Sequence, residues 1–218
     1  MEETKKLSCI DCNVKKCNAK QNIENNKPYP GFCVSHNMDL KDRQRALDTY
    51  LGDEKDLKIM RASAEIEHDF YCQATRVEET IRWAKKLGAK KIGIASCVGL
   101  LKESHLLAGL LREYGFEVYG VGCKIGEVPK TEVGIPERCE EVGVHMCNPI
   151  LQAQMLNKEK TDINIVMGLC VGHDSMFYKY AEGLTTTLVV KDRVLGHNPV
   201  AALYAADGYY HNKLCPQD

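Results

Sequence analysis

The chain has 218 residues, of which 44% are hydrophobic, and its 29 basic and 30 acidic side chains leave a formal net charge of −1. This balance gives no electrostatic reason to expect nucleic acid or an anionic membrane as a partner, so we expect a small-molecule substrate or an electron donor. No apolar run approaches the roughly 20 residues that span a bilayer, and residues 1–6 lack the apolar core of a signal peptide. We therefore predict a cytoplasmic protein with one main domain.

Cysteine is the unusual component of this sequence. The chain contains 11 cysteines, an odd number that cannot pair completely, and a reducing cytosol keeps thiols free. The composition therefore favours metal or sulfur chemistry over a disulfide scaffold. It also favours an anaerobic way of life, in which such a density of thiols survives.

Residues 1–40 are predicted to form a cysteine-rich metal-binding segment. The segment is rich in Asn and Lys, has almost no core of its own, and would stay disordered unless it were crosslinked. We predict that a metal is held by four cysteines: Cys9, Cys12, Cys17 and Cys33. His36 is an alternative ligand. The Cys-x2-Cys-x4-Cys spacing matches neither a zinc ribbon nor a plant-type ferredoxin, which leaves zinc and an iron–sulfur cluster both open.

Residues 41–218 are predicted to form an α/β domain. Charged and apolar residues alternate at helical spacing over 40–50 and 56–87, which predicts two helices. After Gly88, short β-rich runs alternate with helical ones. The expected strands are 91–96, 117–122, 163–169 and 186–190, and the expected helices are 100–114, 149–157, 175–182 and 199–206. Residues 124–146 predict a loop with one short helix over 136–141.

This alternation is typical of an α/β fold with a Rossmann-like parallel sheet of about four strands and helices on both faces. The cysteine-rich segment and the two helices precede the sheet.

Cysteines follow three of the predicted strands. Cys97, Cys123 and Cys170 each lie where an apolar strand ends, and each has a glycine two or three residues later. The carboxyl ends of parallel strands meet at one edge of a sheet, so these thiols should converge there. Cys147, just before a helix that opens with Pro149, is a candidate fourth member. The alternative is that each cysteine is a small buried hydrophobic residue.

Converging thiols predict a soft metal or sulfur chemistry. Three thiolates with one open position suit a [4Fe-4S] cluster whose fourth iron binds substrate, whereas four thiolates in a closed cage suit zinc or an electron-transfer cluster. Deprotonating several adjacent thiols without a cation is unfavourable. We therefore expect a metal, a persulfide, or thiols that stay mostly protonated.

Polar residues follow the same strand ends. His173 and Asp174 come shortly after Cys170, and we predict His173 as a proton carrier beside the metal. Asp174 is either a catalytic residue or the N-cap of the next helix. Beyond the last strand, Lys191, Arg193 and His197 predict a basic rim that fits a carboxylate, phosphate or thiolate group of a substrate. The alternative for Lys191 is a solvated turn.

Six motifs together resemble a known family. They are Ser8-Cys-Ile-Asp-Cys12, Gly93-Ile-Ala-Ser-Cys-Val-Gly-Leu100, Cys123-Lys, Met146-Cys-Asn-Pro-Ile-Leu-Gln152, Gly168-Leu-Cys-Val-Gly-His-Asp174 and Lys191-Asp-Arg-Val-Leu-Gly-His-Asn-Pro199. This pattern is similar to that of the cysteine-rich predicted metal-binding proteins numbered as domain of unknown function DUF1847. The resemblance implies a small prokaryotic cytosolic protein, largely associated with anaerobes, whose N-terminal cysteines bind metal, and it implies no reaction.

Three functions follow from these observations. The first is an iron–sulfur enzyme, such as a lyase, desulfidase or redox enzyme, whose strand-end cysteines hold a [4Fe-4S]-type cluster that acts on a small anionic or sulfur-containing substrate. The second is a non-catalytic metal-binding or metallochaperone module for zinc or another soft metal. The third is a metal-free thiol or persulfide redox protein.

Overall fold

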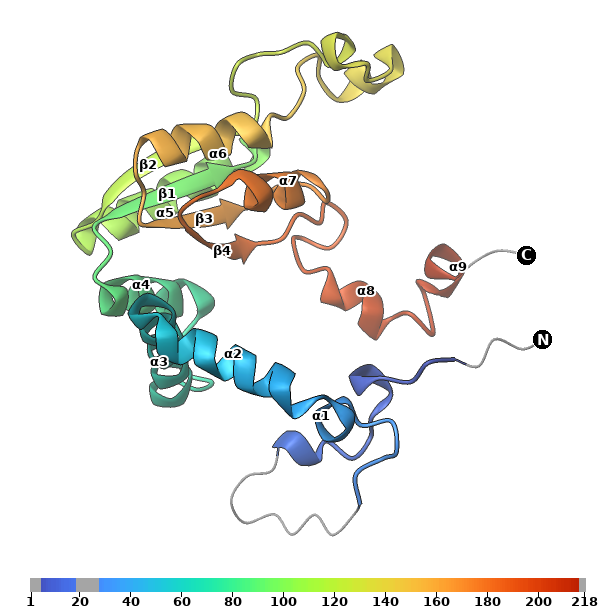
Figure 1. The fold of residues 1–218 in the computed structure, drawn as a ribbon. Coiled ribbons are helices and arrows are strands. Elements are labelled where there is room, and N and C mark those ends of the chain that lie inside the picture. The colour runs from blue at the N-terminus through green and yellow to red at the C-terminus, as the bar shows by residue number, and fades with distance from the viewer. Residues whose placement is uncertain (1–4, 19–27, 216–218) are drawn as a thin grey trace. The chain divides into compact units, whose positions relative to one another are not determined.

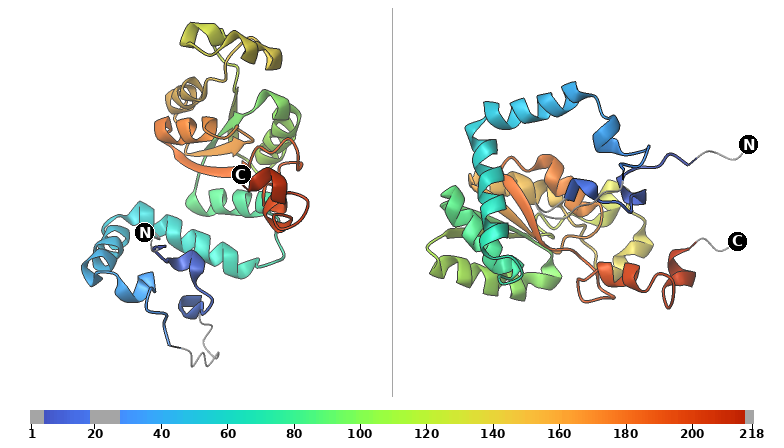
Figure 2. Two further views of the ribbon diagram at one scale, coloured as in Figure 1. Left: turned by 90° about the vertical axis from the view of Figure 1, so that its right-hand side faces the viewer. Right: turned by 90° about the horizontal axis from the view of Figure 1, so that it is seen from below.

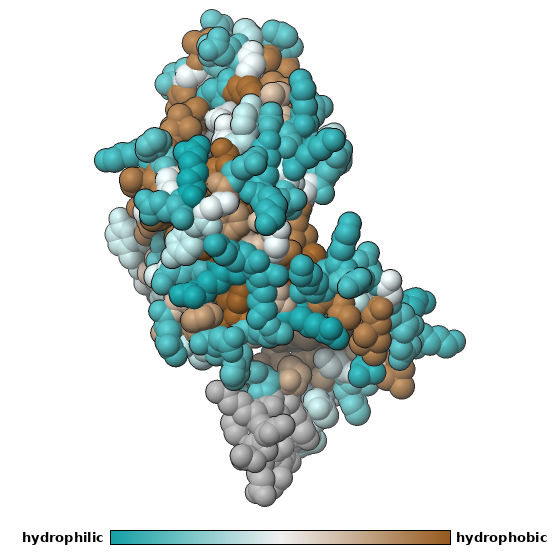
Figure 3. All heavy atoms as spheres, turned by 90° about the vertical axis from the view of Figure 1, so that its left-hand side faces the viewer, coloured by the Kyte–Doolittle hydropathy of each residue, from teal (hydrophilic) through white to brown (hydrophobic). Residues whose placement is uncertain are grey.

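The structure is a computed structural model, and it describes residues 5–18 and 28–215 (Figure 1). The chain divides into two compact units, Met1–Arg61 and Ala62–Asp218. Among the described residues no helix is long and apolar enough to cross a membrane. One face of the molecule is mostly hydrophilic, with apolar side chains scattered over it (Figure 3), as on most folded proteins.

The first unit consists of short helices with little core. Its elements are the 3-10 helices η1 (Cys9–Asp11) and η2 (Lys16–Asn18) and the helices α1 (Val34–Asn37), α2 (Leu40–Gly52) and the start of α3 (Glu54–Asp69). Neither α1 nor α2 has a buried residue. Asp39 caps α2 by accepting a hydrogen bond of 2.9 Å from the backbone N–H of Lys41. The predicted helix over 40–50 is confirmed by α2.

The predicted helix over 56–87 is wrong, because two helices stand in its place. α3 ends at Asp69, and α4 (Arg76–Leu87) begins after a turn in which Cys72 has a φ of 56°. A capping box starts α4: the Thr75 hydroxyl accepts from the Glu78 backbone N–H, and the Glu78 carboxylate accepts from the Thr75 N–H at 2.8 Å. Gly88 ends α4 in the left-handed conformation with a φ of 78°.

Four parallel strands of the second unit form one sheet, as predicted. The strands are β1 (Lys91–Ser96), β2 (Glu117–Gly122), β3 (Ile163–Met167) and β4 (Leu184–Val189), and their order is β2-β1-β3-β4. All three neighbouring pairs are parallel, and an irregularity between Val166 and Met167 shifts the register against β4. This is a Rossmann-like, doubly wound arrangement.

Helices cover both faces of the sheet, also as predicted. They are α4, α5 (Leu101–Glu113), α6 (Pro149–Lys158) and α7 (His173–Tyr180). On one face Ile92 and Ile94 of β1 pack with residues of α4 and α5. On the other face Ala95 packs with residues of α6 and α7, and Figure 2 separates these two helices from α5. Because successive side chains of β1 point to opposite faces of the sheet, the domain has one hydrophobic core on each face.

The remaining elements differ slightly from their predicted bounds. β3 ends at Met167, α7 begins at His173, and the closing helix is the shorter α8 (Val200–Tyr204), followed by α9 (His211–Leu214). Between β2 and α6 lie the 3-10 helices η4 (Lys130–Val133) and η5 (Glu137–Val142), the second close to the helix predicted over 136–141.

An arginine contacts the backbone of each outer strand. Arg112 of α5 donates from Nη2 to the carbonyl oxygen of Val118 in β2 at 3.3 Å. Arg76 of α4 donates from Nε to the carbonyl oxygen of Thr187 in β4 at 2.9 Å. Both outer strands thus have a backbone acceptor occupied by a charged donor.

Gly93 and Gly109 provide a matched test of this packing. A Cβ at Gly93 would lie 2.3 Å from Oδ1 of the buried Asn164, whereas a Cβ at Gly109 in α5 would meet no atom within 4 Å. We expect Gly93→Ala to lower the free energy of unfolding by about 1–3 kcal/mol through overpacking. Gly109→Ala should raise it by about 0.5–1 kcal/mol through helix propensity. Urea unfolding measures both, and a neutral Gly93→Ala would contradict the described contact between β1 and β3.

Candidate functional site

The candidate site lies where the order of the strands reverses. β2 lies on one side of β1, whereas β3 and β4 lie on the other side. In sheets of this kind, ligands bind at the carboxyl ends of the strands beside this switch point. Cys97 directly follows β1, and its backbone N–H donates to the carbonyl oxygen of Met167 at the end of β3 at 3.0 Å. Cys123 directly follows β2.

Three of the four predicted sulfur atoms meet at this edge. The Sγ atoms of Cys147 and Cys123 are 3.7 Å apart, and the thiol of Cys123 lies close enough to that of Cys97 to lower the pKa of Cys97. Cys97 and Cys123 are buried, and Cys147 is half-buried. We call Cys97, Cys123 and Cys147 the three-thiol cluster.

The segment between β2 and α6 explains why Cys123 and Cys147 are neighbours. The chain leaves the sheet after Cys123 and returns at Cys147. The two arms of this excursion are joined by an antiparallel bridge between Pro129 and His145 and by a hydrogen bond of 2.9 Å from Met146 to Val128. The closed excursion brings residues that are 24 positions apart into contact.

The first turn of α6 organises the cluster. Asn148 is the N-cap: its Oδ1 accepts from the Leu151 N–H at 3.0 Å, and its own N–H donates to the Cys123 carbonyl oxygen at 2.7 Å. One turn later Gln152, which is fully buried, donates from Nε2 to the carbonyl oxygens of Ser96 at 3.1 Å and Val121 at 2.7 Å. These two carbonyls belong to the ends of β1 and β2, so one side chain joins the strands that deliver Cys97 and Cys123.

Cys170 contacts the predicted basic rim. Its Sγ accepts a hydrogen bond of 3.1 Å from Nη2 of Arg193, an exposed residue beyond β4. The interaction with this thiol raises the pKa of Arg193. Across the described residues, no three side chains of His, Cys, Asp or Glu are arranged to share one metal ion.

Lys191 reaches the cluster over a glycine. Gly168 has a φ of 64°, and a Cβ there would lie 2.2 Å from Leu100 Cδ1 and 3.5 Å from Lys191 Nζ. The absence of a side chain and the left-handed backbone therefore leave room for both neighbours. Lys191 in turn lies near enough to Cys97 to help lower the pKa of that thiol.

The charges around the cluster set its protonation. The pKa of Cys97 falls to about 5 because of hydrogen bonds from Cys123, the Gly99 backbone and Lys191. The pKa of Cys147 falls to about 4 because of hydrogen bonds from Cys123 and His173 and the nearby charge of Lys124. The pKa of Cys123 rises, because its thiol is hydrogen-bonded to both neighbours and is buried. The central sulfur thus keeps its proton between two thiolates.

His173 is the imidazole nearest to the cluster. It opens α7, and its hydrogen bond with Cys147 raises its pKa. Its Nδ1 is buried and has no hydrogen-bond partner in the part of the chain that the structure describes. The raised pKa of His173 and the lowered pKa of Cys147 favour an imidazolium beside a thiolate, an arrangement known from reactive cysteines.

Two predicted site residues have local backbone contacts. Asp174 accepts from the Ser175 N–H at 2.8 Å, but the N-cap of α7 is Gly172, so the alternative of Asp174 as N-cap is wrong. His197, with a φ of 67°, accepts at Nδ1 from the Asp192 N–H at 3.1 Å and thereby closes the turn after β4. Roles for Asp174 and His197 in chemistry stay predictions.

Sequence reasoning missed three contributors to this site. Lys124 is one of them, although its position directly after Cys123 places its charge at the strand end. Gln152 and the Gly99 N–H carry no local signal, because their roles depend on segments that are distant in the chain.

The N-terminal cysteines lie in loops and short turns. Cys9 and Cys17 are exposed, and Cys12 and Cys33 are half-buried. In residues 5–18 and 28–61 these thiols do not form a group of three around a common point. Metal binding by the four of them stays a prediction.

Gln152 and Gln154 test the role of α6. Gln152→Met keeps the volume but leaves the carbonyls of Ser96 and Val121 buried without a donor, so we expect the free energy of unfolding to fall by about 2–4 kcal/mol. Gln154 is exposed on the same helix, and Gln154→Met should change it by less than about 0.5 kcal/mol. If urea unfolding showed equal effects of Gln152→Met and Gln154→Met, the two hydrogen bonds from Gln152 would not stabilise the protein as described.

His173 controls the titration of Cys147. In reduced, metal-free protein the ultraviolet absorbance of thiolate should persist as the pH falls from neutral and disappear between about 5 and about 4. In His173→Gln the positive charge that the imidazole can supply to the thiolate is lost, so the lower midpoint should rise by about 1 pH unit or more. His105→Gln, at an exposed site in α5, is the control and should titrate like the wild type. An unchanged midpoint in His173→Gln would contradict the described pair.

Two comparisons with known proteins identify the family of this chain. A sequence profile described as "Protein of unknown function (DUF1847)" matches residues 33–188, which include the three-thiol cluster, Cys170 and His173. A protein of Methanocaldococcus jannaschii described as "Uncharacterized protein MJ0455" is 40% identical over 208 residues, covering 95% of this chain and 98% of the relative. The chain therefore belongs to the DUF1847 family.

Proposed function

We propose that the three-thiol cluster holds a soft metal centre, a [4Fe-4S]-type cluster, beside a cationic subsite for a small anionic or sulfur-containing substrate. The observation that carries this proposal is that Cys97, Cys123 and Cys147 come from three separate segments to the switch point of the sheet. In the described residues these three side chains do not surround a common point, so metal binding would have to draw them together. The donor set consists of thiols without a carboxylate, which suits iron–sulfur clusters, zinc or copper(I) and not magnesium or calcium.

The protonation of the cluster supports this proposal. Two of the sulfurs are thiolates, the form that binds metal, and they share one proton through Cys123. A metal would take the place of that proton, so loading should release it. Cys170 and Arg193 lie within reach of the same edge and would meet a ligand that enters from outside.

The surrounding cations supply the substrate subsite in this proposal. Arg193 is exposed and would bind a carboxylate, phosphate or thiolate group through its planar donor pair. Lys191 would neutralise further negative charge, and His173 would hold or move a proton at its ring nitrogen. An electron donor is the expected partner if the reaction is a redox reaction. The N-terminal cysteines would hold a second metal, either zinc or iron, and a reducing cytoplasm would keep all these thiols available.

A second function is favoured by one distance. Two sulfurs bound to one tetrahedral ion at about 2.3 Å would be about 3.8 Å apart. The described separation of 3.7 Å between Cys123 and Cys147 is close to this value. A single zinc or other soft ion, held by a non-catalytic metal-binding or metallochaperone module, is therefore the alternative.

Anaerobic purification followed by metal analysis distinguishes these functions. We expect iron and acid-labile sulfide with a broad visible absorption band in the wild type. Zinc alone would support the second function. If the protein contained neither iron nor zinc, metal-free thiol or persulfide chemistry would be supported instead.

Variants locate the metal. Cys123→Ser should remove the iron of the sheet edge and, if the N-terminal site also holds iron, leave about half of the total. Cys170→Ser tests whether this thiol is a ligand or only a neighbour. Cys72→Ser, an exposed cysteine in the turn before α4, is the control and should keep wild-type metal content and colour. If Cys123→Ser also kept both, the assignment of the metal to the sheet edge would be wrong.

A further inference from the structure

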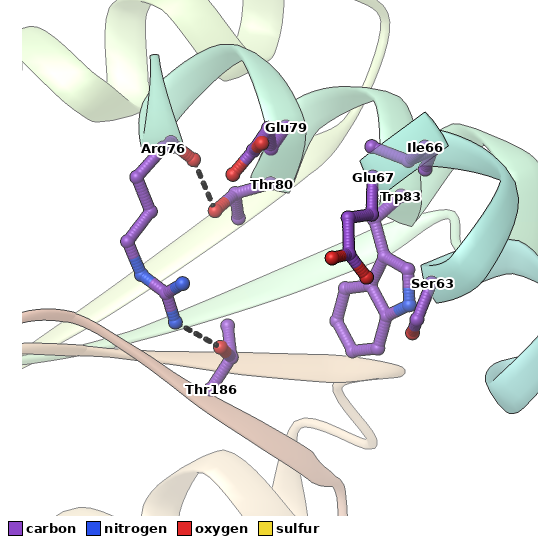
Figure 4. A pocket seen from close by; sticks show the side chains of 8 residues that line it. All are labelled: Ser63, Ile66, Glu67, Arg76, Glu79, Thr80, Trp83 and Thr186. Carbon is purple, nitrogen blue, oxygen red and sulfur yellow. Dashed lines mark hydrogen bonds between the residues drawn. The ribbon is translucent and has the colours of Figure 1, made fainter. Parts of the chain in front are cut away.

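A second site lies between α3, α4 and β4 in the unit that contains the sheet. It is a cavity of about 310 Å³, drawn in Figure 4. Its lining contains no cysteine or histidine, so it does not share the chemistry of the sheet edge. A cavity of this size is at the lower limit of those that enclose small molecules.

The walls of this cavity are held in place without a ligand. Ile66 of α3 is buried, and Lys86 of α4 forms an ion pair with Glu65 of α3. The guanidinium of Arg82 lies over the ring of Phe70 at 4.0 Å from its centre. These contacts join α3 to α4, so the cavity is preformed.

The cation in the lining is already engaged. Arg76 directs its guanidinium to β4, where Nε donates to the Thr187 carbonyl oxygen at 2.9 Å and Nη2 donates to the Thr186 hydroxyl at 3.4 Å (Figure 4). Arg76 therefore closes one wall and is not turned toward the carboxylates on the other side.

Two carboxylates of the lining lack partners. Glu67 and Glu79 have no hydrogen bond or ion pair through their carboxylates within the described parts of the chain; Glu79 is half-buried and Glu67 is exposed. Figure 4 shows the Glu67 carboxylate beside the indole ring of Trp83. A bound cation would give both carboxylates an ion-pair partner.

Trp83 adds an aromatic face and an unsatisfied donor. Its Nε1 is buried and has no hydrogen-bond partner among the described residues. Indole is the aromatic group that binds cations best. Two carboxylates are too few for a bare metal ion, and no set of three metal-ligating side chains is present in the described residues.

We propose that this cavity binds a small organic ammonium ion, with its charged group between Glu67, Glu79 and the face of Trp83. A hydrogen-bond acceptor on the same molecule would satisfy the indole N–H. This site is independent of the function proposed for the sheet edge.

The experiment uses the fluorescence of Trp83, the only tryptophan in the sequence. Choline and ethanolamine, a quaternary and a primary ammonium ion with the same hydroxyl group, are titrated at constant ionic strength into the full chain. We expect a saturable change for at least one of them with a Kd of about 1 mM or tighter. The uncharged isostere of choline, in which carbon replaces nitrogen, should bind at least about fivefold more weakly.

Charge-neutral variants provide the second arm. Glu67→Gln and Glu79→Gln should each weaken binding at least about fivefold. Glu113→Gln, at the exposed end of α5, makes the same charge change away from the cavity and should bind like the wild type. Calorimetry repeats each titration so that binding without a fluorescence change is still detected, and circular dichroism verifies the fold of each variant.

Three results would overturn the proposal. They are the absence of saturable binding of either cation by both methods up to about 10 mM, equal affinity for the uncharged isostere, and unchanged affinity in both glutamine variants.

Discussion

The sheet edge depends on the two hydrogen bonds that Gln152 donates to β1 and β2. Parallel strands diverge at their carboxyl ends because of the sheet twist, and the backbone groups there lose their partners in the ladder. A buried amide that reaches the carbonyls of Ser96 and Val121 satisfies two such groups and fixes the separation of the strands. The same helix begins with Asn148, which holds the Cys123 carbonyl, and Cys147 precedes it. One helix terminus therefore determines the relative positions of three sulfurs.

Charge is the second constraint on this edge. Two thiolates in a half-buried cluster would repel each other and lose hydration, so they persist only with donors and cations nearby. The backbone N–H of Val98 donates to Cys123 Sγ at 3.4 Å, while Lys124, Lys191 and His173 supply positive charge. These donors and cations favour the charged form of the cluster, and the packing of the domain holds them in place.

The sequence predicted the architecture because its signals are local. Alternating strand and helix periods indicate a parallel sheet, and the position of a cysteine directly after a strand places it at the carboxyl edge. The break between α3 and α4 was missed although Thr75 and Glu78 form a capping box that can be read in the sequence. The helical spacing of apolar residues continues through the turn, and this spacing predicts one continuous helix despite the capping box.

Other features could not be predicted from one sequence. Gln152 contacts residues that are 56 and 31 positions away, so its role follows only from the packing of α6. The contact of Cys170 with Arg193 likewise joins residues that are 23 positions apart. The cavity beside Trp83 likewise combines α3, α4 and β4, and its carboxylates look like an ordinary helix surface in the sequence.

The arginines at the two outer strands have a consequence for association. An outer strand with unoccupied carbonyls is a template on which a strand of another molecule can add, which leads to aggregation or domain swapping. Arg112 occupies the Val118 carbonyl on β2, and Arg76 occupies the Thr187 carbonyl on β4. A strand that approaches either side of this sheet would have to displace a guanidinium from its acceptor before it could extend the ladder.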